Sequence, residues 1–250
     1  YQNFLEENNL YRGKYVDQSF NRLIQLDLFS QITPELRENE DQTIDVHYFL
    51  TPSKRQLFIF EPRATNSNGF LGVESAINYQ HKNLFGGGER LKISFSGGFE
   101  SQPPIFDETE SGNAITNAGK SFNAIEFGPT VELQIPGLYP FALNKIAKRQ
   151  MPRTAISAAY NVHNRDDFNR RVIQLSYNWR FFDIKRTQVF TIGIPLIGGF
   201  QFLNIEKEQS FEDRLIQQND LFLINAYSNQ FIWKDIKLVY QYSNQEVRTG

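Results

Sequence analysis

The chain has 250 residues, a formal net charge of −2 and no cysteine. The near-neutral charge gives no global basic field for nucleic acid, and the lack of thiols excludes disulfide bonds and thiolate-bound metals. No apolar run approaches the roughly 20 residues of a membrane-spanning helix. Aromatic residues are nevertheless abundant, with 23 Phe and 11 Tyr, which is typical of the aromatic girdles of membrane β-barrels.

Residues 1–53 are expected to form a small α+β unit. Asp17 can cap a helix that runs to Leu28. The apolar residues expected on the buried side of this helix are Phe20, Leu23 and Ile24. A strand follows over 31–37, where Pro34 favours a sheet edge. A second strand, from Thr43 to Leu50, alternates apolar and polar residues, so this part of the chain predicts a helix followed by two strands.

From residue 55 the expected strands are longer. The first, over 55–63, alternates poorly and contains Pro62, which predicts a weakly paired edge strand. The next two, over 69–80 and 90–100, alternate with a period of two and form a β-hairpin. Each is about ten to twelve residues long, enough for a tilted strand to cross a bilayer. The turn between them consists of Asn83, Leu84, Phe85, Gly86, Gly87 and Gly88, where glycine permits positive φ.

The same alternation recurs later in the chain. Further strands are expected over 125–135, 156–163, 173–181 and 233–243, about seven long strands in all. Residues 182–230 are expected not to cross the membrane and to contain one helix, over 210–218, capped by Ser210. The residues expected to face lipid are Leu91, Ile93, Phe95, Ile173, Leu175, Tyr177 and Trp179. The residues expected in aromatic girdles are Tyr79, Phe85, Tyr139, Trp179 and Phe181.

Several segments resemble the BamA–TamA family of outer-membrane assembly factors, in the versions typical of Bacteroidetes. Tyr11-Arg12 and Leu23-Ile24-Gln25-Leu26-Asp27-Leu28-Phe29 are similar to the end of a POTRA domain. Thr65-Asn66-Ser67 and Asn83-Leu84-Phe85-Gly86-Gly87-Gly88-Glu89 resemble the first two barrel strands and the turn after them. Tyr177-Asn178-Trp179 and Ser228-Asn229-Gln230-Phe231-Ile232 fit later strands. The resemblance covers essentially the whole chain.

The chain departs from the family in the number of strands. Family barrels have sixteen strands, and the Val-Arg-Gly-Phe/Tyr signature of their later half has no match here. The chain also begins without a signal peptide, so we expect a partial or processed form of a longer protein. The expected fold is mostly β, with the C-terminal part of a POTRA domain in 1–53 and the first half of an antiparallel outer-membrane β-barrel in 54–250.

The resemblance implies insertion and folding of outer-membrane proteins, or protein translocation across that membrane. The protein would lie in the bacterial outer membrane, with its N-terminal domain in the periplasm. The implied partners are outer-membrane protein substrates, periplasmic or lipoprotein accessory subunits and the lipid bilayer, without nucleic acid. The strand expected to act as a lateral gate comprises Arg55, Gln56, Leu57, Phe58, Ile59 and Phe60. The POTRA edge expected to bind partners comprises Thr43, Ile44, Asp45 and Val46.

With the N-terminal domain in the periplasm, alternate connections face outward. The expected outside loops are 65–68, 101–121 and 164–167, and the expected periplasmic connections are 83–88, 136–152 and 182–230. Polar residues that alternate with the apolar ones are expected to line a wet lumen. They are Glu74, Lys92, Glu126, Glu132 and Arg180.

Two other classes of protein remain open. One is a passive outer-membrane pore, and the other is a soluble β-rich binding protein. No enzyme, cofactor or metal site is expected. Gly119-Lys120-Ser121 resembles the end of a phosphate-binding loop, but Ala114 stands where the first glycine belongs. The acidic segment 107–110 is expected to be a solvated loop, and the three histidines, His47, His81 and His163, are far apart in sequence.

Overall fold

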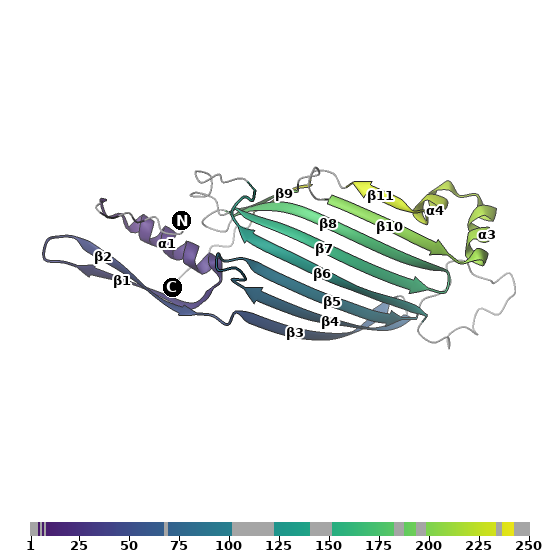
Figure 1. Ribbon diagram of the computed structural model, residues 1–250, viewed down its shortest axis with the longest axis horizontal. Helices are drawn as coiled ribbons and strands as arrows, with labels where there is room; N and C mark the ends of the chain where they lie inside the picture. The colour runs from purple at the N-terminus through teal and green to yellow at the C-terminus, as the bar shows by residue number, and fades with distance from the viewer. Residues whose placement is uncertain are drawn as a thin grey trace.

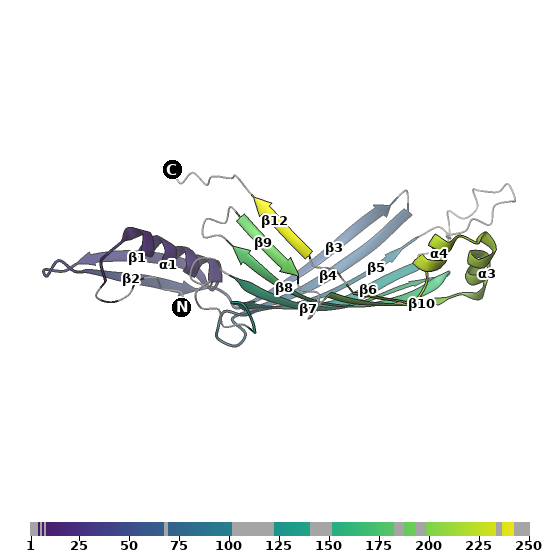
Figure 2. The ribbon, with the colours of Figure 1, turned by 90° about the horizontal axis from the view of Figure 1, so that it is seen from above.

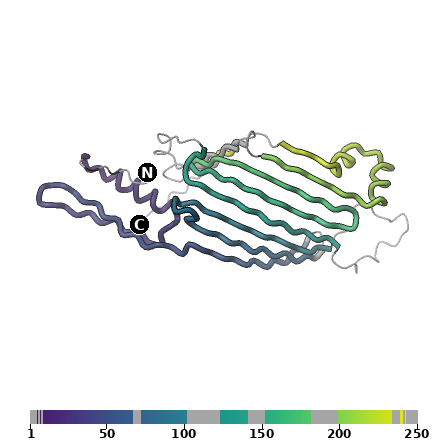
Figure 3. The backbone as a smooth tube through the Cα atoms, viewed as in Figure 1, coloured from purple at the N-terminus to yellow at the C-terminus, as the bar shows by residue number. Residues whose placement is uncertain are grey.

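The computed structural model describes residues 5, 7, 9–67, 70–101, 123–140, 152–182, 188–193, 199–233 and 237–242. Within these residues the chain is mostly β, as expected. It consists of a small N-terminal α+β unit followed by a large, curved antiparallel sheet (Figure 1). The backbone trace in Figure 3 follows the chain back and forth across this sheet from one strand to its neighbour.

The N-terminal unit contains helix α1 (Gly13–Leu26) and strands β1 (Phe29–Glu38) and β2 (Ile44–Pro52). The order helix, strand, strand agrees with the sequence, but the helix begins before Asp17. Its N-cap residue is Arg12, which makes no side-chain cap hydrogen bond. The expected cap at Asp17 is therefore wrong. Strands β1 and β2 pair antiparallel, with Pro34 of β1 opposite Tyr48 of β2.

The buried side of α1 also differs from the expected one. Its buried residues are Val16, Ser19, Arg22 and Gln25, which recur every third position. Ile24, expected to be buried, is 42% exposed. The helix is positioned by contacts with the strand pair rather than by its apolar residues alone, because Tyr48 Oη donates to Val16 O at 3.2 Å. Partial burial at this contact raises the pKa of Tyr48.

Six long strands make the first part of the large sheet. They are β3 (Gln56–Ser67), β4 (Phe70–Lys82), β5 (Arg90–Glu100), β6 (Ala124–Pro136), β7 (Arg153–Arg165) and β8 (Phe168–Phe182). Each pairs antiparallel with the next in the sequence. The bounds of β5 coincide with the expected strand over 90–100, and the other five overlap their expected ranges.

Four short strands complete the sheet: β9 (Gln188–Gly193), β10 (Gly199–Lys207), β11 (Gln230–Trp233) and β12 (Lys237–Tyr242). Strands β9 and β10 pair with different halves of β8, so together they occupy one position beside it. Strand β11 pairs with β10 and β12 with β9, so these two occupy the next position. The ten strands therefore fill eight positions. The expected number of about seven strands is therefore one position short of the observed sheet. The segment 182–230, expected to contain no strand of the sheet, contributes β9, β10 and β11, and β12 lies within the expected strand over 233–243.

The connections separate to the two ends of the sheet. The turn over 83–88 lies at the end next to α1, and the connection from β7 to β8 lies at the opposite end (Figure 1). Helices α3 (Gln209–Gln218) and α4 (Leu221–Ala226) also lie at the end far from α1. The sequence predicts the helix over 210–218 at the end near α1. It lies at the far end because β10 carries the chain across the sheet. Ser210 does not cap α3, whose N-cap residue is Glu208.

The two helices cover part of one face of the sheet. Phe211 and Leu215 of α3 pack in a buried cluster with Phe168 of β8 and Ile205 of β10. Figure 2 shows that the sheet is curved, that β3 and β12 rise on the same side, and that α3 and α4 lie on that side. The face that carries Phe168 and Ile205 is therefore the concave face.

Candidate functional site

The large sheet has one continuous apolar face. One residue from each of the eight positions lies in register across this face, and the row runs Phe58, Tyr79, Ile93, Val131, Ala158, Leu175, Phe200 and Trp233. Phe58 at one end of the row is 65% exposed, and Trp233 at the other is 52% exposed. A soluble sheet normally covers such a face with other protein.

The next row belongs to the opposite, concave face and is mainly polar. It runs Leu57, Gln80, Lys92, Glu132, Ser157, Ser176 and Gly199. Lys92 and Glu132, both expected on a wet surface, lie opposite each other on β5 and β6. Along these two rows the faces therefore differ, with mainly apolar side chains outside the curve and mainly polar ones inside it. Exceptions on the concave face are Phe168 and Ile205, which α3 covers.

Of the residues expected to face lipid, Ile93, Phe95, Ile173 and Leu175 are on the apolar face and exposed. Leu91 and Trp179 are on the same face but only partly exposed. Tyr177 is buried, at 7% exposed, so its expected exposure to lipid is wrong. Residues 137–140, directly after β6, lie against this end of the face, where Tyr139 O accepts hydrogen bonds from Tyr177 Oη and, at 3.1 Å, from Trp179 Nε1.

A hollow of about 220 Å³ on the concave face is lined by Glu74, Ser96, Glu126 and His163, among others. Its carboxylates already have partners. Glu126 Oε1 accepts from Asn161 Nδ2 at 2.7 Å and its Oε2 lies 3.4 Å from His163 Nδ1, while Glu74 lies 3.8 Å from Arg63. No group of three or more acidic, histidine or cysteine side chains in the described part of the chain could hold a metal ion. The segments 107–110 and 119–121 lie outside the described residues.

The strand expected to act as a gate, β3, is the end strand of the sheet. It pairs with β4 over twelve residues, from Gln56↔His81 to Ser67↔Phe70, and with no other strand among the described residues. Arg55 immediately precedes the strand. The structure thus places the five residues from Gln56 to Phe60 along an open edge of the sheet, as the position of Pro62 in the sequence suggested.

The register determines which backbone groups face this open edge. Lys82 N donates to Arg55 O at 2.7 Å, and the register then continues to Ser67 without a shift. In an antiparallel pair, hydrogen-bonded residues alternate with residues whose N–H and C=O point away from the partner. The odd-numbered residues of β3 therefore bond to β4. The outward N–H groups are those of Gln56, Phe58, Phe60, Ala64 and Asn66.

Pro62 fits this alternation. It lies opposite Ser75 at an even-numbered position, so its missing N–H does not remove a hydrogen bond between β3 and β4. It does remove one donor from the open edge. The edge therefore offers an unbroken run of outward donors from Gln56 to Phe60, followed by a gap.

The expected partner-binding edge of the N-terminal unit is also open. Strand β2 pairs only with β1 among the described residues. It begins at Ile44, so Asp45 and Val46 lie in the strand, but Thr43 belongs to the preceding turn. There Thr43 Oγ1 donates to Asp41 Oδ1 at 2.6 Å, and this hydrogen bond lowers the pKa of Asp41.

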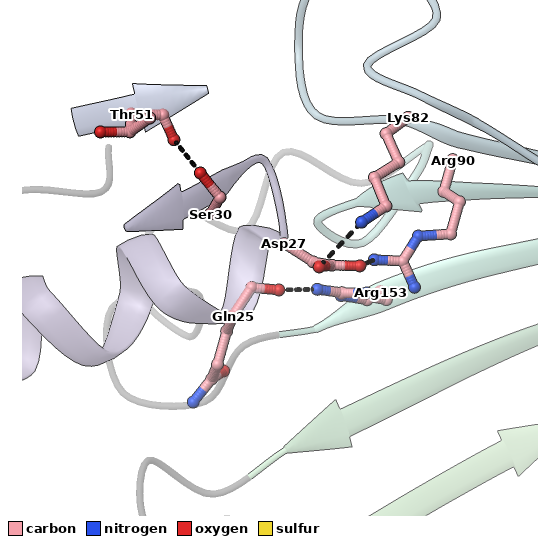
Figure 4. A network of polar contacts seen from close by, with 7 residues as sticks. All are labelled: Gln25, Asp27, Ser30, Thr51, Lys82, Arg90 and Arg153. Carbon is pink, nitrogen blue, oxygen red and sulfur yellow. Dashed lines mark hydrogen bonds and ion pairs between the residues drawn. The ribbon is translucent and has the colours of Figure 1, made fainter. Parts of the chain in front are cut away.

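A polar junction that the sequence did not reveal joins the N-terminal unit to the sheet (Figure 4). Asp27, which ends α1 with φ of 58°, accepts from Lys82 Nζ at 3.0 Å and from Arg90 Nη2 at 2.7 Å. Arg153 Nη2 donates to the backbone carbonyl of Gln25. These residues are far apart in sequence, so no local motif could have identified the junction. Its position next to the start of β3 links the N-terminal unit to the open edge.

The expected turn over 83–88 belongs to this junction. Gly88 has φ of 90°, and a Cβ there would lie 3.5 Å from Leu26 of α1. The turn does not offer its N–H groups to a phosphate, because Phe85 N and Gly87 N donate to the Glu89 carboxylate and Gly88 N donates to Asn83 Oδ1. The glycines therefore serve a tight turn beside α1.

Removing the Asp27 carboxylate should loosen the junction. We expect Asp27→Ala to cost at most about 1 kcal/mol, because Asp27 is partly exposed, and to broaden the motion of the N-terminal unit relative to the sheet. Since the chain has no cysteine, spin labels on Glu38→Cys and Thr130→Cys would report that distance. Glu35→Ala, which removes an ion pair with Arg37 inside the unit, should leave the distance distribution unchanged, and an unchanged distribution in Asp27→Ala would contradict the role of this junction.

No protein-family model and no curated protein matches this chain. Among the residues that the structure describes, no helix is both long enough and apolar enough to span a membrane.

Proposed function

We propose that this chain is the end of a POTRA domain followed by the first half of an outer-membrane β-barrel, in an assembly factor of the BamA–TamA kind. The exposed apolar face across eight strand positions supports a lipid-facing surface, and the polar concave face supports a wet lumen. The small α+β unit before the sheet supports the POTRA assignment. Its position at one end of the strands suits a periplasmic domain.

The function that follows is insertion and folding of outer-membrane proteins, or their translocation across that membrane. The single observation that carries it is the open edge of β3, with outward N–H groups at Gln56, Phe58 and Phe60. An unpaired edge is strongly disfavoured in lipid, where no water can satisfy its backbone groups. Another strand must therefore cover it, and when the barrel's own last strand leaves, an incoming strand can pair there by β-augmentation.

The remaining partners follow from the same arrangement. The open edge of β2 would bind periplasmic or lipoprotein accessory subunits, or substrate, by the same backbone pairing. The junction at Asp27 would transmit the position of this N-terminal unit to the base of β3. None of these steps requires a cofactor or covalent catalysis.

Depletion of the protein in its own cells would test the function. We expect several unrelated outer-membrane barrel proteins to fall together in the outer-membrane fraction and to accumulate unfolded in the periplasm, as quantified by mass spectrometry. A passive pore predicts a different result, in which uptake of small solutes falls while the barrel proteins stay at their normal amounts. That second outcome would contradict the assembly function.

A further inference from the structure

The open edge of β3 is chemically uneven along its length, and this unevenness specifies what can pair with it. Its first half is apolar on both faces of the sheet. Phe58 and Phe60 lie on the apolar face at 65% and 59% exposed, and Leu57 and Ile59 lie on the otherwise polar concave face at 46% and 39% exposed. At the level of Leu57, the next three strands carry the polar residues Gln80, Lys92 and Glu132 on this face.

The apolar stretch has a definite end. Glu61 follows it on the concave face and is exposed, and Pro62 then interrupts the outward donors. Arg63 lies on the same face as Glu61, 3.8 Å from Glu74 of β4. A partner strand therefore meets four apolar side chains, then one carboxylate, and then a position where its own carbonyl has no donor to bond.

We propose that the strand that pairs with β3 carries a basic residue followed directly by four apolar residues. The proposal rests on the proposed function, because it names the sequence pattern that the open edge would recognise. Directly opposite residues of neighbouring strands share a face. Two apolar side chains would pack against Leu57 and Ile59 on the concave face, and two others would pack against Phe58 and Phe60 on the lipid face. A Lys or Arg would pair with the carboxylate of Glu61.

The order of this pattern follows from strand direction. Every strand pair in the two sheets is antiparallel, so a strand that extends the sheet at β3 runs opposite to it. The residue opposite Glu61 then precedes the residues opposite Phe60, Ile59, Phe58 and Leu57. Four consecutive apolar residues depart from the usual alternation of a barrel strand, which makes the pattern distinctive.

Peptide labelling of the intact protein in lipid nanodiscs would test this pattern. A photoreactive benzoylphenylalanine replaces Gln56, whose backbone faces the open edge. Three biotinylated eight-residue peptides are compared. The first has Lys before four apolar residues, and the second has Glu in place of that Lys. The third has the composition of the first, rearranged so that apolar and polar residues alternate. Because cross-strand charge pairs are modest, we expect the Lys peptide to reach half-maximal labelling at about two- to fivefold lower concentration than the Glu peptide.

A charge reversal supplies the matched control. In the Glu61→Lys variant the Glu peptide should label better than the Lys peptide, whereas Glu35→Lys in the N-terminal unit should leave the original order unchanged. Equal labelling by all three peptides would overturn the pattern while keeping β3 as a strand-binding edge. The absence of labelling by any peptide would overturn both the pattern and the proposed function.

Discussion

Replacement of Ile93 by arginine is expected to prevent most of the chain from assembling in the membrane. Ile93 is the fourth residue of β5, lies between Tyr79 of β4 and Val131 of β6, and is 39% exposed on the apolar face. An arginine facing lipid costs up to about 2–4 kcal/mol, the value at the bilayer midplane. The full cost corresponds to a roughly 30- to 700-fold loss in the ratio of inserted to uninserted protein. The inserted fraction can be measured as the protein that resists extraction of membranes with urea.

Ser94→Arg is the matched control, because Ser94 is the next residue on β5 and lies on the concave face, opposite Asn78 and Thr130. A charge there would face water in the lumen, so we expect normal insertion. Equal damage from both substitutions would contradict the assignment of the two faces. Normal insertion of Ile93→Arg would contradict the contact with lipid.

Replacement of Phe58 by proline is expected to abolish much of the assembly activity while leaving the sheet folded. The N–H of Phe58 points to the open edge, so proline removes a donor for an incoming strand and no hydrogen bond between β3 and β4. Pro62, two even-numbered positions further along, is already accommodated in the same way. The amounts of folded barrel proteins in cells that depend on the variant would measure the loss.

Two control variants separate the effects of this substitution. Phe58→Ala removes the same aromatic side chain but keeps the N–H, so it should retain more activity than Phe58→Pro. Ile59→Pro removes an N–H that faces β4, so it should destabilise the β3–β4 hairpin itself, visible as faster hydrogen exchange in both strands. If Phe58→Ala and Phe58→Pro behaved alike, the backbone of β3 would not be the binding group.

The sequence predicted those parts of the fold where alternation is strong and uninterrupted. The range 90–100 matches β5 because apolar and polar residues alternate there over eleven residues. Alternation did not reveal β9 and β10. Strand β9 has only six residues. In β10, Leu203 and Ile205 are apolar on the concave face because they pack in the cluster with α3, and this interrupts the alternation of apolar and polar residues.

The candidate site was only partly predictable for a related reason. Pro62 and the irregular composition of 55–63 indicated an edge strand, because both depend on local sequence. The direction of each N–H on β3 depends on its register with β4, and the junction at Asp27 depends on Lys82 and Arg90, 55 and 63 residues away. Such long-range pairings leave no local signal in a single sequence. In α1, the apolar residues likewise indicated the wrong buried side. The residues that are buried include the polar Ser19, Arg22 and Gln25.

The most direct test of the open edge is photo-crosslinking in living cells from benzoylphenylalanine at Gln56 and at Phe58, in the protein as it occurs in the outer membrane. We expect crosslinks to newly made outer-membrane proteins while their synthesis continues, and their disappearance when synthesis stops. Crosslinks only to other strands of the same protein, during active synthesis, would show that β3 belongs to a closed seam and would contradict strand capture at this edge.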